Sequence, residues 1–261
     1  MKKKIHSSFY YATIAILILT VISCKESKKE SKTESLNSFT GIWVAKNFMD
    51  TVIINRGIKT VDNGVTELIV PQNLKDSIIF LNEDLERDKY PATIKNDTLI
   101  SHFDKKNTQK AVIRNGNLIL LPLDERYHEQ EYIKADSSLI RKAQEANVSV
   151  VRVLINKVLT DHLYATKSSK NIIMFTQDGK VQGLDNLKNY HININGDEAH
   201  ADDITSITFT TTNGSNKYLG IEFQKDRIDL YDLVLLTKSD EKPFYKKGNL
   251  LYSLTAIQSQ K

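Results

Sequence analysis

Dipeptides that form tight turns divide this chain into short segments, and they restrict its fold more than any other feature. They are Asn115-Gly116, Asp178-Gly179, Asn195-Gly196 and Asn213-Gly214, each lying between short apolar or β-branched runs. A type I′ hairpin turn needs positive φ at both central residues, which Asn, Asp and Gly adopt at low cost. Because such turns join strands that run in opposite directions, we expect antiparallel hairpins and a fold that is mainly β.

Residues 39–135 are predicted to form one β domain. Strands are expected at 41–44, 51–54, 65–70, 77–81, 92–94, 98–103, 109–114, 118–121 and 129–134. Asn96-Asp97 and Asn115-Gly116 fall between consecutive strands, as hairpins require. Eight or nine closely spaced strands with no helix between them indicate an antiparallel meander, most easily a barrel or a sandwich.

Residues 136–158 change from a strand period to a helical one and are predicted to form a linker helix. Asp136 or Ser137 can cap its N-terminus. Apolar residues then recur at spacings of one, three and four, which place them on one helical face. The β-branched run 148–153 leaves a strand as the alternative for the second half of this segment.

A second β domain is predicted over residues 159–261. Strands are expected at 159–165, 171–176, 188–194, 206–212, 217–224, 227–236 and 250–257, again as a small antiparallel barrel. The openings 39–43 and 159–164 both end in an aromatic residue, so the two halves can be interpreted as a diverged repeat. Two unrelated units are the alternative.

The N-terminal stretch has the properties of an export signal. Lysines at positions 2 to 4 precede an apolar run from Tyr10 to Ile22. Clustered lysines oppose translocation, while an apolar segment enters the bilayer. The run has about 13 residues, whereas a spanning helix needs ~20. We therefore expect a signal peptide over residues 1–23, with an uncleaved anchor helix as the alternative.

The end of this stretch resembles the lipobox of bacterial lipoproteins. Val21 supplies the aliphatic residue, Ser23 the small one, and Cys24 is the single cysteine of the chain. The resemblance implies that Cys24 carries acyl chains such as palmitate and holds the protein on a membrane. Residues 24–38 are charged and Ser-rich, and are predicted to be a disordered tether. By the same resemblance, Lys25 favours the outer membrane, with the protein facing the periplasm or the surface.

The opening of the first β domain, Gly41-x-Trp43, resembles the first-strand signature of lipocalins and other calycins. In that family the Trp packs across the closed end of the barrel. The resemblance therefore implies a lipocalin-like barrel with Trp43 in its core, and makes Arg141 the candidate for the family's C-terminal Arg. It implies no particular ligand.

Two polar clusters are candidates for chemistry. The densest group of potential metal ligands is Asp197, Glu198, His200, Asp202 and Asp203. Such residues can hold Ca²⁺ or a transition metal, but a polar hairpin loop is the preferred interpretation. The acidic segment 124–131 is interpreted as a surface strand with cross-strand charge pairs. No nucleophile or phosphate-loop motif is present in the sequence, so no catalytic residue, metal or cofactor is assigned.

Charge and motifs together narrow the function. Removing the three lysines of the leader lowers the formal net charge from +4 to +1, which argues against binding of nucleic acid. We expect a non-enzymatic, membrane-anchored envelope lipoprotein whose barrels bind a small apolar ligand or a partner protein. The alternatives are a structural or immunity-type protein that acts by surface contact and, less favoured, an envelope hydrolase near His200, Asp202 and Asp203. Open barrel interiors would favour the small ligand, and filled interiors a surface partner.

Overall fold

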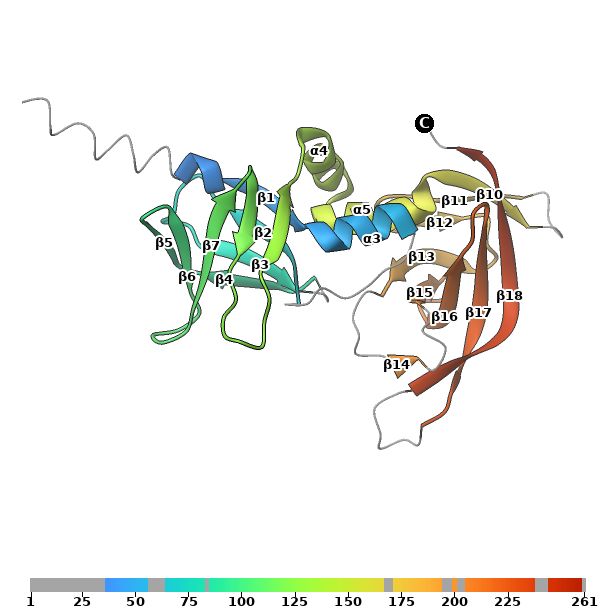
Figure 1. Cartoon of the computed structure of the whole chain (residues 1–261). Coiled ribbons are helices and arrows are strands. Elements are labelled where there is room, and N and C mark those ends of the chain that lie inside the picture. Colours follow the sequence, from blue (N-terminus) through green and yellow to red (C-terminus); the bar gives the residue numbers. More distant parts are fainter. Residues whose placement is uncertain are drawn as a thin grey trace, which may run out of the picture.

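The computed structural model describes residues 36–55, 64–82, 85–166, 171–193, 199–200, 205–237 and 244–259. They form two antiparallel, barrel-like sheets with helices between them (Figure 1). The expected fold class, mainly β with two meander units separated by a helical segment, is confirmed.

The first barrel contains nine strands in the order β4-β3-β2-β1-β9-β8-β7-β6-β5. Their bounds are β1 (Gly41–Ala45), β2 (Val65–Val70), β3 (Ile78–Asn82), β4 (Arg87–Tyr90), β5 (Ala92–Lys95), β6 (Thr98–His102), β7 (Thr108–Arg114), β8 (Asn117–Leu120) and β9 (Gln130–Lys134). The first strand pairs with the last. β4 pairs with β3, β5 pairs with β6, and only Pro91 separates them, so one bent strand connects the two edges. The result is a nearly closed barrel.

The second barrel repeats this plan with eight strands in the order β12-β11-β10-β18-β17-β16-β15-β13. Their bounds are β10 (His162–Thr166), β11 (Ile172–Phe175), β12 (Val181–Gln182), β13 (Leu187–Ile192), β15 (Thr205–Thr211), β16 (Asn216–Phe223), β17 (Arg227–Leu235) and β18 (Phe244–Ser259). A short strand, β14 (Ala199–His200), pairs in parallel with β18. Again the first strand pairs with the last. A bridge between Lys180 and Asn189 brings the β12 and β13 edges together.

Residues 51–54 do not form the expected strand. They lie in the helix α3 (Lys46–Asn55), which separates β1 from β2, so the expectation of no helix between the strands is wrong. The apolar run is short, and short runs fit a helix and a strand equally well. Phe48 is buried in the hydrophobic core, and this tertiary packing favours the helix. The polar strand β4 is not among the expected strands and brings the count back to nine.

Two helices connect the barrels, α4 (Ser137–Ala146) and α5 (Val150–Thr160). Asp136 caps α4, as one of the two predicted candidates, by accepting a hydrogen bond from a backbone N–H of the first turn at 2.8 Å. Ser149 caps α5 in the same way. The strand alternative for 148–153 is therefore wrong. Nearly every residue of α5 is buried, so packing outweighs the weak helix propensity of its β-branched residues.

Large side chains fill both barrels. Trp43 is 1% exposed in the first, and its Nε1 donates to the backbone oxygen of Phe39 at 2.7 Å. In the second, the Phe175 ring makes edge-to-face contacts with Tyr164 and Tyr190, with centroids 5.8 and 5.2 Å apart. The prediction that Trp43 belongs to the core is confirmed. At the level of these rings, the interiors of both barrels are filled by buried side chains.

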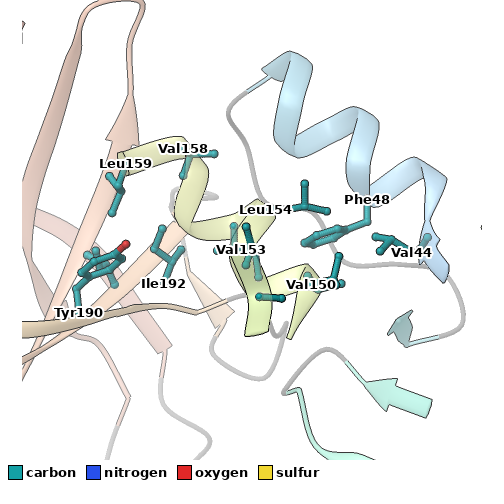
Figure 2. Close-up of a cluster of buried hydrophobic side chains, with 14 of the residues drawn as sticks. Val44, Phe48, Val150, Val153, Leu154, Val158, Leu159, Tyr190 and Ile192 are labelled. Atoms are coloured by element: carbon teal, nitrogen blue, oxygen red, sulfur yellow. The ribbon is translucent and has the colours of Figure 1, made fainter. Parts of the chain in front are cut away.

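The helix α5 lies between the two barrels and contacts both (Figure 2). On the side of the first barrel, Val150 and Leu154 of α5 lie with Val44 and Phe48. On the side of the second, Val158 and Leu159 of α5 lie with Tyr190 and Ile192. All of these side chains belong to one buried cluster that continues through both barrels. The described part of the chain therefore packs as a single unit around α5.

Candidate functional site

Most of the predicted functional positions lie outside the described residues. They are the signal peptide 1–23, Cys24, all of the tether 24–38 except its last three residues, and Asp197, Glu198, Asp202 and Asp203. His200 lies in β14. Within the described residues, no helix has the length and apolar character needed to cross a membrane. Lipidation and the metal alternative therefore stay predictions.

The cation over Trp43 is a lysine of β9. Lys134 Nζ lies 5.4 Å from the centroid of the Trp43 ring, a cation–π distance. Arg141, the candidate that the lipocalin resemblance suggested, is exposed on α4 and pairs with Glu145 at 3.8 Å. Among the described residues, Lys134 and not Arg141 therefore covers this ring.

The acidic segment 124–131 is mostly a loop, because β9 begins at Gln130. The expectation of a surface strand is wrong for its first six residues. The expected charge pairs are present: Glu129 lies 2.6 Å from Arg114, and Glu131 lies 2.9 Å from Lys46. These pairs are partly exposed and contribute little to stability.

This loop borders a groove of about 510 Å³ in the first barrel. The β6–β7 turn provides Phe103, Lys106 and Lys110, the last at the start of β7, and the β8–β9 loop provides Leu123, Arg126 and Tyr127. We call this the basic groove. It brings cations and apolar rings together on the outside of a barrel whose interior is filled.

Hydrogen bonds hold both walls of the basic groove in place. The buried Gln109 donates from Nε2 to the backbone oxygens of Leu121 at 2.5 Å and Lys110 at 3.2 Å, so it ties the two walls together. Asp104 accepts backbone N–H groups of Lys106 and Asn107 at 2.7 and 2.8 Å. These hydrogen bonds also lower the pKa of Asp104. The groove is therefore formed before any ligand arrives.

The electrostatics of the basic groove are dominated by cations. Asp124 accepts two hydrogen bonds from Arg126, at 3.0 and 2.7 Å, and Arg126 lowers the pKa of this carboxyl group to about 2. Their charges compensate each other. Lys106 and Lys110 make no ion pair with any described residue. The two lysines therefore leave the groove with a positive field.

A second set of polar side chains holds α5 to the first barrel. The carboxylate of Glu67 on β2 is buried and accepts the backbone N–H of Val151 at 2.9 Å. It thus meets the positive end of the helix dipole. Burial raises the pKa of Glu67, while hydrogen bonds from the α5 backbone and the charge of Arg87 oppose this rise.

The opposite side of α5 holds the second barrel by hydrogen bonds. The buried guanidinium of Arg152 donates to the backbone oxygen of Ile192 at 2.9 Å and lies 2.8 Å from Nε2 of His191. Asn156 donates to the backbone oxygen of Gln177 at 2.8 Å. Burial lowers the pKa of Arg152 to about 10, and burial with the nearby guanidinium lowers that of His191 to about 4. These contacts fix the position of α5 between the barrels. Together with the contact between Glu67 and Val151 we call them the joint.

The third feature is a group of exposed apolar residues on the β17–β18 hairpin, three at the end of β17 and two further along β18, where Leu250 pairs with Tyr231. They are Val234, Leu235, Leu236, Leu250 and Leu251, and we call them the apolar hairpin. β16 pairs with β17 only as far as Asp232, whereas β18 pairs with it as far as Leu235. Among the described strands, the last residues of β17 therefore have a partner on one side only. Figure 1 shows this pair of strands extending beyond the rest of the barrel.

Sequence reasoning missed the basic groove, the joint and the apolar hairpin. A usable signal existed for the joint, since Arg152 and Asn156 are polar residues within a largely apolar helix. The groove had none, because its two walls come together only through the pairing of β7 with β8. No protein-family model matches the chain, and no curated protein or solved structure shows significant similarity to it.

Proposed function

We propose that this protein is a non-enzymatic envelope lipoprotein, held on the outer membrane by acyl chains on Cys24, that binds a partner protein through its second barrel. The lipobox residues support the anchoring. Of the two occupants expected from the sequence, the partner protein is favoured over a small apolar ligand inside a barrel. The reason is that aromatic and aliphatic side chains fill both interiors.

The observation that carries this proposal is the apolar hairpin. Single exposed leucines are common on soluble proteins, but five large apolar residues on one pair of strands indicate an interaction site. Leu235 and Leu250 are each 52% exposed. The edge of β17 beyond Asp232, which carries Val234 and Leu235, has no partner strand on the β16 side among the described residues and offers backbone groups to an added strand. Lys246, exposed on β18 and paired with Val234, favours an acidic residue in the partner.

The proposed partner segment is therefore an extended strand that alternates apolar and acidic residues. It would add to β17 in the way that peptides add to open sheet edges. Main-chain hydrogen bonds would provide affinity, and the leucines would provide specificity.

Site-specific photocrosslinking in cells tests the proposal. A photoreactive amino acid at Leu235 or Leu250 of the full-length protein should give one discrete adduct with another envelope protein. The same amino acid at Lys95, on the first barrel, is the control. The purified partner should bind the native protein and bind Leu235→Ser/Leu250→Ser at least tenfold more weakly, since truncating central apolar contacts costs more than ~1.4 kcal/mol. Equal binding of the variant would exclude the hairpin as the site.

The anchor is tested separately. Cys24→Ser should release the protein from the membrane fraction and abolish incorporation of labelled palmitate. A variant that stays in the membrane fraction would contradict the lipid anchor without affecting the proposal for the hairpin.

A further inference from the structure

We propose that the basic groove of the first barrel binds a small amphiphilic anion, meaning a phosphate, sulfonate or carboxylate group attached to an apolar body. This site is independent of the apolar hairpin, which belongs to the other barrel. The ligand would be either a free small molecule or the headgroup of a lipid, since both present the same chemistry.

The anionic group is inferred from charges that lack a partner. Lys106 and Lys110 line the groove from one wall and form no ion pair with a described residue. Arg126 on the other wall is held in place by Asp124 through two hydrogen bonds. Three cations around one cavity, with one carboxylate already compensated, attract an anion and repel a cation.

The apolar body is inferred from the apolar side chains that both walls contribute. Phe103 packs against Tyr90 and Phe80 with ring centroids 4.4 and 5.7 Å apart, so its position is fixed by the core below. Leu123 and Tyr127 lie on the opposite wall, and Leu123 is 49% exposed. A volume of about 510 Å³ lies within the range of pockets for small ligands. A ligand with an apolar body would cover Leu123 while its charged end meets the lysines.

The walls of the basic groove are held by hydrogen bonds, which indicates a binding site rather than a chance depression of the surface. Gln109 ties the two walls together, and Asp104 fixes the turn that carries Lys106. Fixed walls reduce the entropy that a ligand loses on binding. The geometry therefore assigns the polar end of the ligand to the lysine wall and its apolar end to Leu123 and Tyr127.

The test uses two fluorescent probes of similar shape on the Cys24→Ser form of the full chain in buffer without detergent, because micelles would bind both probes and dissolve vesicles. The anion 8-anilinonaphthalene-1-sulfonate should bind, and the neutral N-phenyl-1-naphthylamine should bind at least tenfold more weakly. Lys106→Ala/Lys110→Ala should weaken the anionic probe about tenfold, because two partly exposed charges each contribute modestly. Lys105→Ala is the matched control, since Lys105 is exposed on the same turn but does not line the groove.

Salt and a second variant separate this site from the hairpin. Raising the salt from 50 to 500 mM should weaken the anionic probe for the native protein and leave the double-lysine variant nearly unchanged, because salt screens exposed charges. Leu235→Ser/Leu250→Ser should leave salt-dependent binding intact. Equal affinity of the native protein and Lys106→Ala/Lys110→Ala, or stronger binding of the neutral probe to the native protein, would overturn the proposal.

Competition then identifies the source of the ligand. Displacement of the bound anionic probe by soluble dodecyl phosphate alone indicates a free amphiphile. Displacement by vesicles that contain phosphatidylglycerol, but not by vesicles of phosphatidylcholine alone, indicates a lipid headgroup. Failure of both competitors would contradict the assignment of an amphiphilic anion.

Discussion

Both barrels pair their first strand with their last, β1 with β9 and β10 with β18, yet they hold the helix between them by different chemistry. The first barrel meets α5 through apolar side chains and one buried carboxylate, Glu67. The second also meets it through apolar side chains, and adds hydrogen bonds from Arg152 and Asn156 to backbone oxygens. Apolar packing tolerates small shifts, whereas hydrogen bonds to fixed carbonyls specify one orientation. The apolar cluster therefore provides most of the stability, and the hydrogen bonds set the position of one barrel on the other.

Removing the apolar contact should have the largest effect. Phe48 on α3 is 2% exposed and lies toward α5 in Figure 2. Phe48→Ala should lower the free energy of unfolding by about 3–5 kcal/mol, as expected for deleting a buried aromatic ring. Urea unfolding followed by Trp43 fluorescence measures it, since Trp43 lies in the first barrel. A loss below about 1 kcal/mol would mean that α5 does not depend on this contact.

Removing the polar contact should lower the free energy of unfolding by less, but it should make the two barrels unfold in separate transitions. Arg152→Met keeps the apolar length of the side chain and leaves the oxygen of Ile192 without its donor. We expect a loss of about 2 kcal/mol, the cost of an unsatisfied buried group. The transition followed by far-ultraviolet circular dichroism should then precede that of Trp43 fluorescence, because the second barrel opens first.

Arg141→Met is the matched control for Arg152→Met. Arg141 is exposed on α4 and pairs with Glu145 at 3.8 Å, so its loss should change stability by less than about 0.5 kcal/mol. Coincident transitions for Arg152→Met would show that the two barrels unfold together without this contact.

The turns were predictable because a turn depends on its own few residues, whereas the helices of the joint depend on contacts between distant parts of the chain. Asn115 and Gly116 both have positive φ, as do Asn96 and Asp97, which confirms the predicted conformation of these two turns. In the turns at 178–179 and 213–214 only the glycine has positive φ, so these two are turns of another type. Asn195-Gly196 lies outside the described residues. A turn depends on its own residues, so its sequence is sufficient. In contrast, α3 and α5 become helical through burial between barrels, which no short window of sequence contains.

The same distinction applies to the candidate sites. The pairing of β17 beyond the end of β16 depends on strand lengths, and the basic groove depends on two segments brought together by the meander. Lys106 and Arg126 are ordinary surface cations in the sequence. Only the register of β7 with β8 and β6 places their loops side by side. The anchoring motif proposed at Cys24 is different, because a signal peptidase would recognise it by local sequence alone.

Replacing Glu67 by Gln should change stability less than Phe48→Ala or Arg152→Met. It tests whether the first barrel needs the charge of this side chain or only its hydrogen bond to α5. Glu67→Gln keeps an oxygen that can accept the N–H of Val151, so it should change stability by less than about 1 kcal/mol. Glu67→Ala should cost about 2 kcal/mol, since the buried N–H then lacks an acceptor. Because the native pKa of Glu67 is raised, the protonated side chain stabilises the folded state fully below the ordinary pKa of 4.5. This stabilisation is lost as pH rises through the native pKa, and Glu67→Gln should remove that dependence. Equal losses for Gln and Ala would show that the negative charge itself is required.

The smallest effect should be an acid sensitivity confined to the second barrel. His191 has a native pKa of about 4, against an ordinary value of 6.5, so the unfolded chain binds its proton first as pH falls. Its contribution to stability is therefore complete above pH 6.5 and is lost progressively between pH 6.5 and about 4. His191 is exposed to solvent on one side, so we expect about 1 kcal/mol rather than the full value of the shift.

Urea unfolding at pH 7 and pH 4.5 should show this loss in the native protein and a smaller one in His191→Gln. If His191→Gln loses as much stability as the native protein, the acid sensitivity originates elsewhere. The polar side of α5 would then be insensitive to pH over this range, and the contrast with the Glu67 side would be stronger.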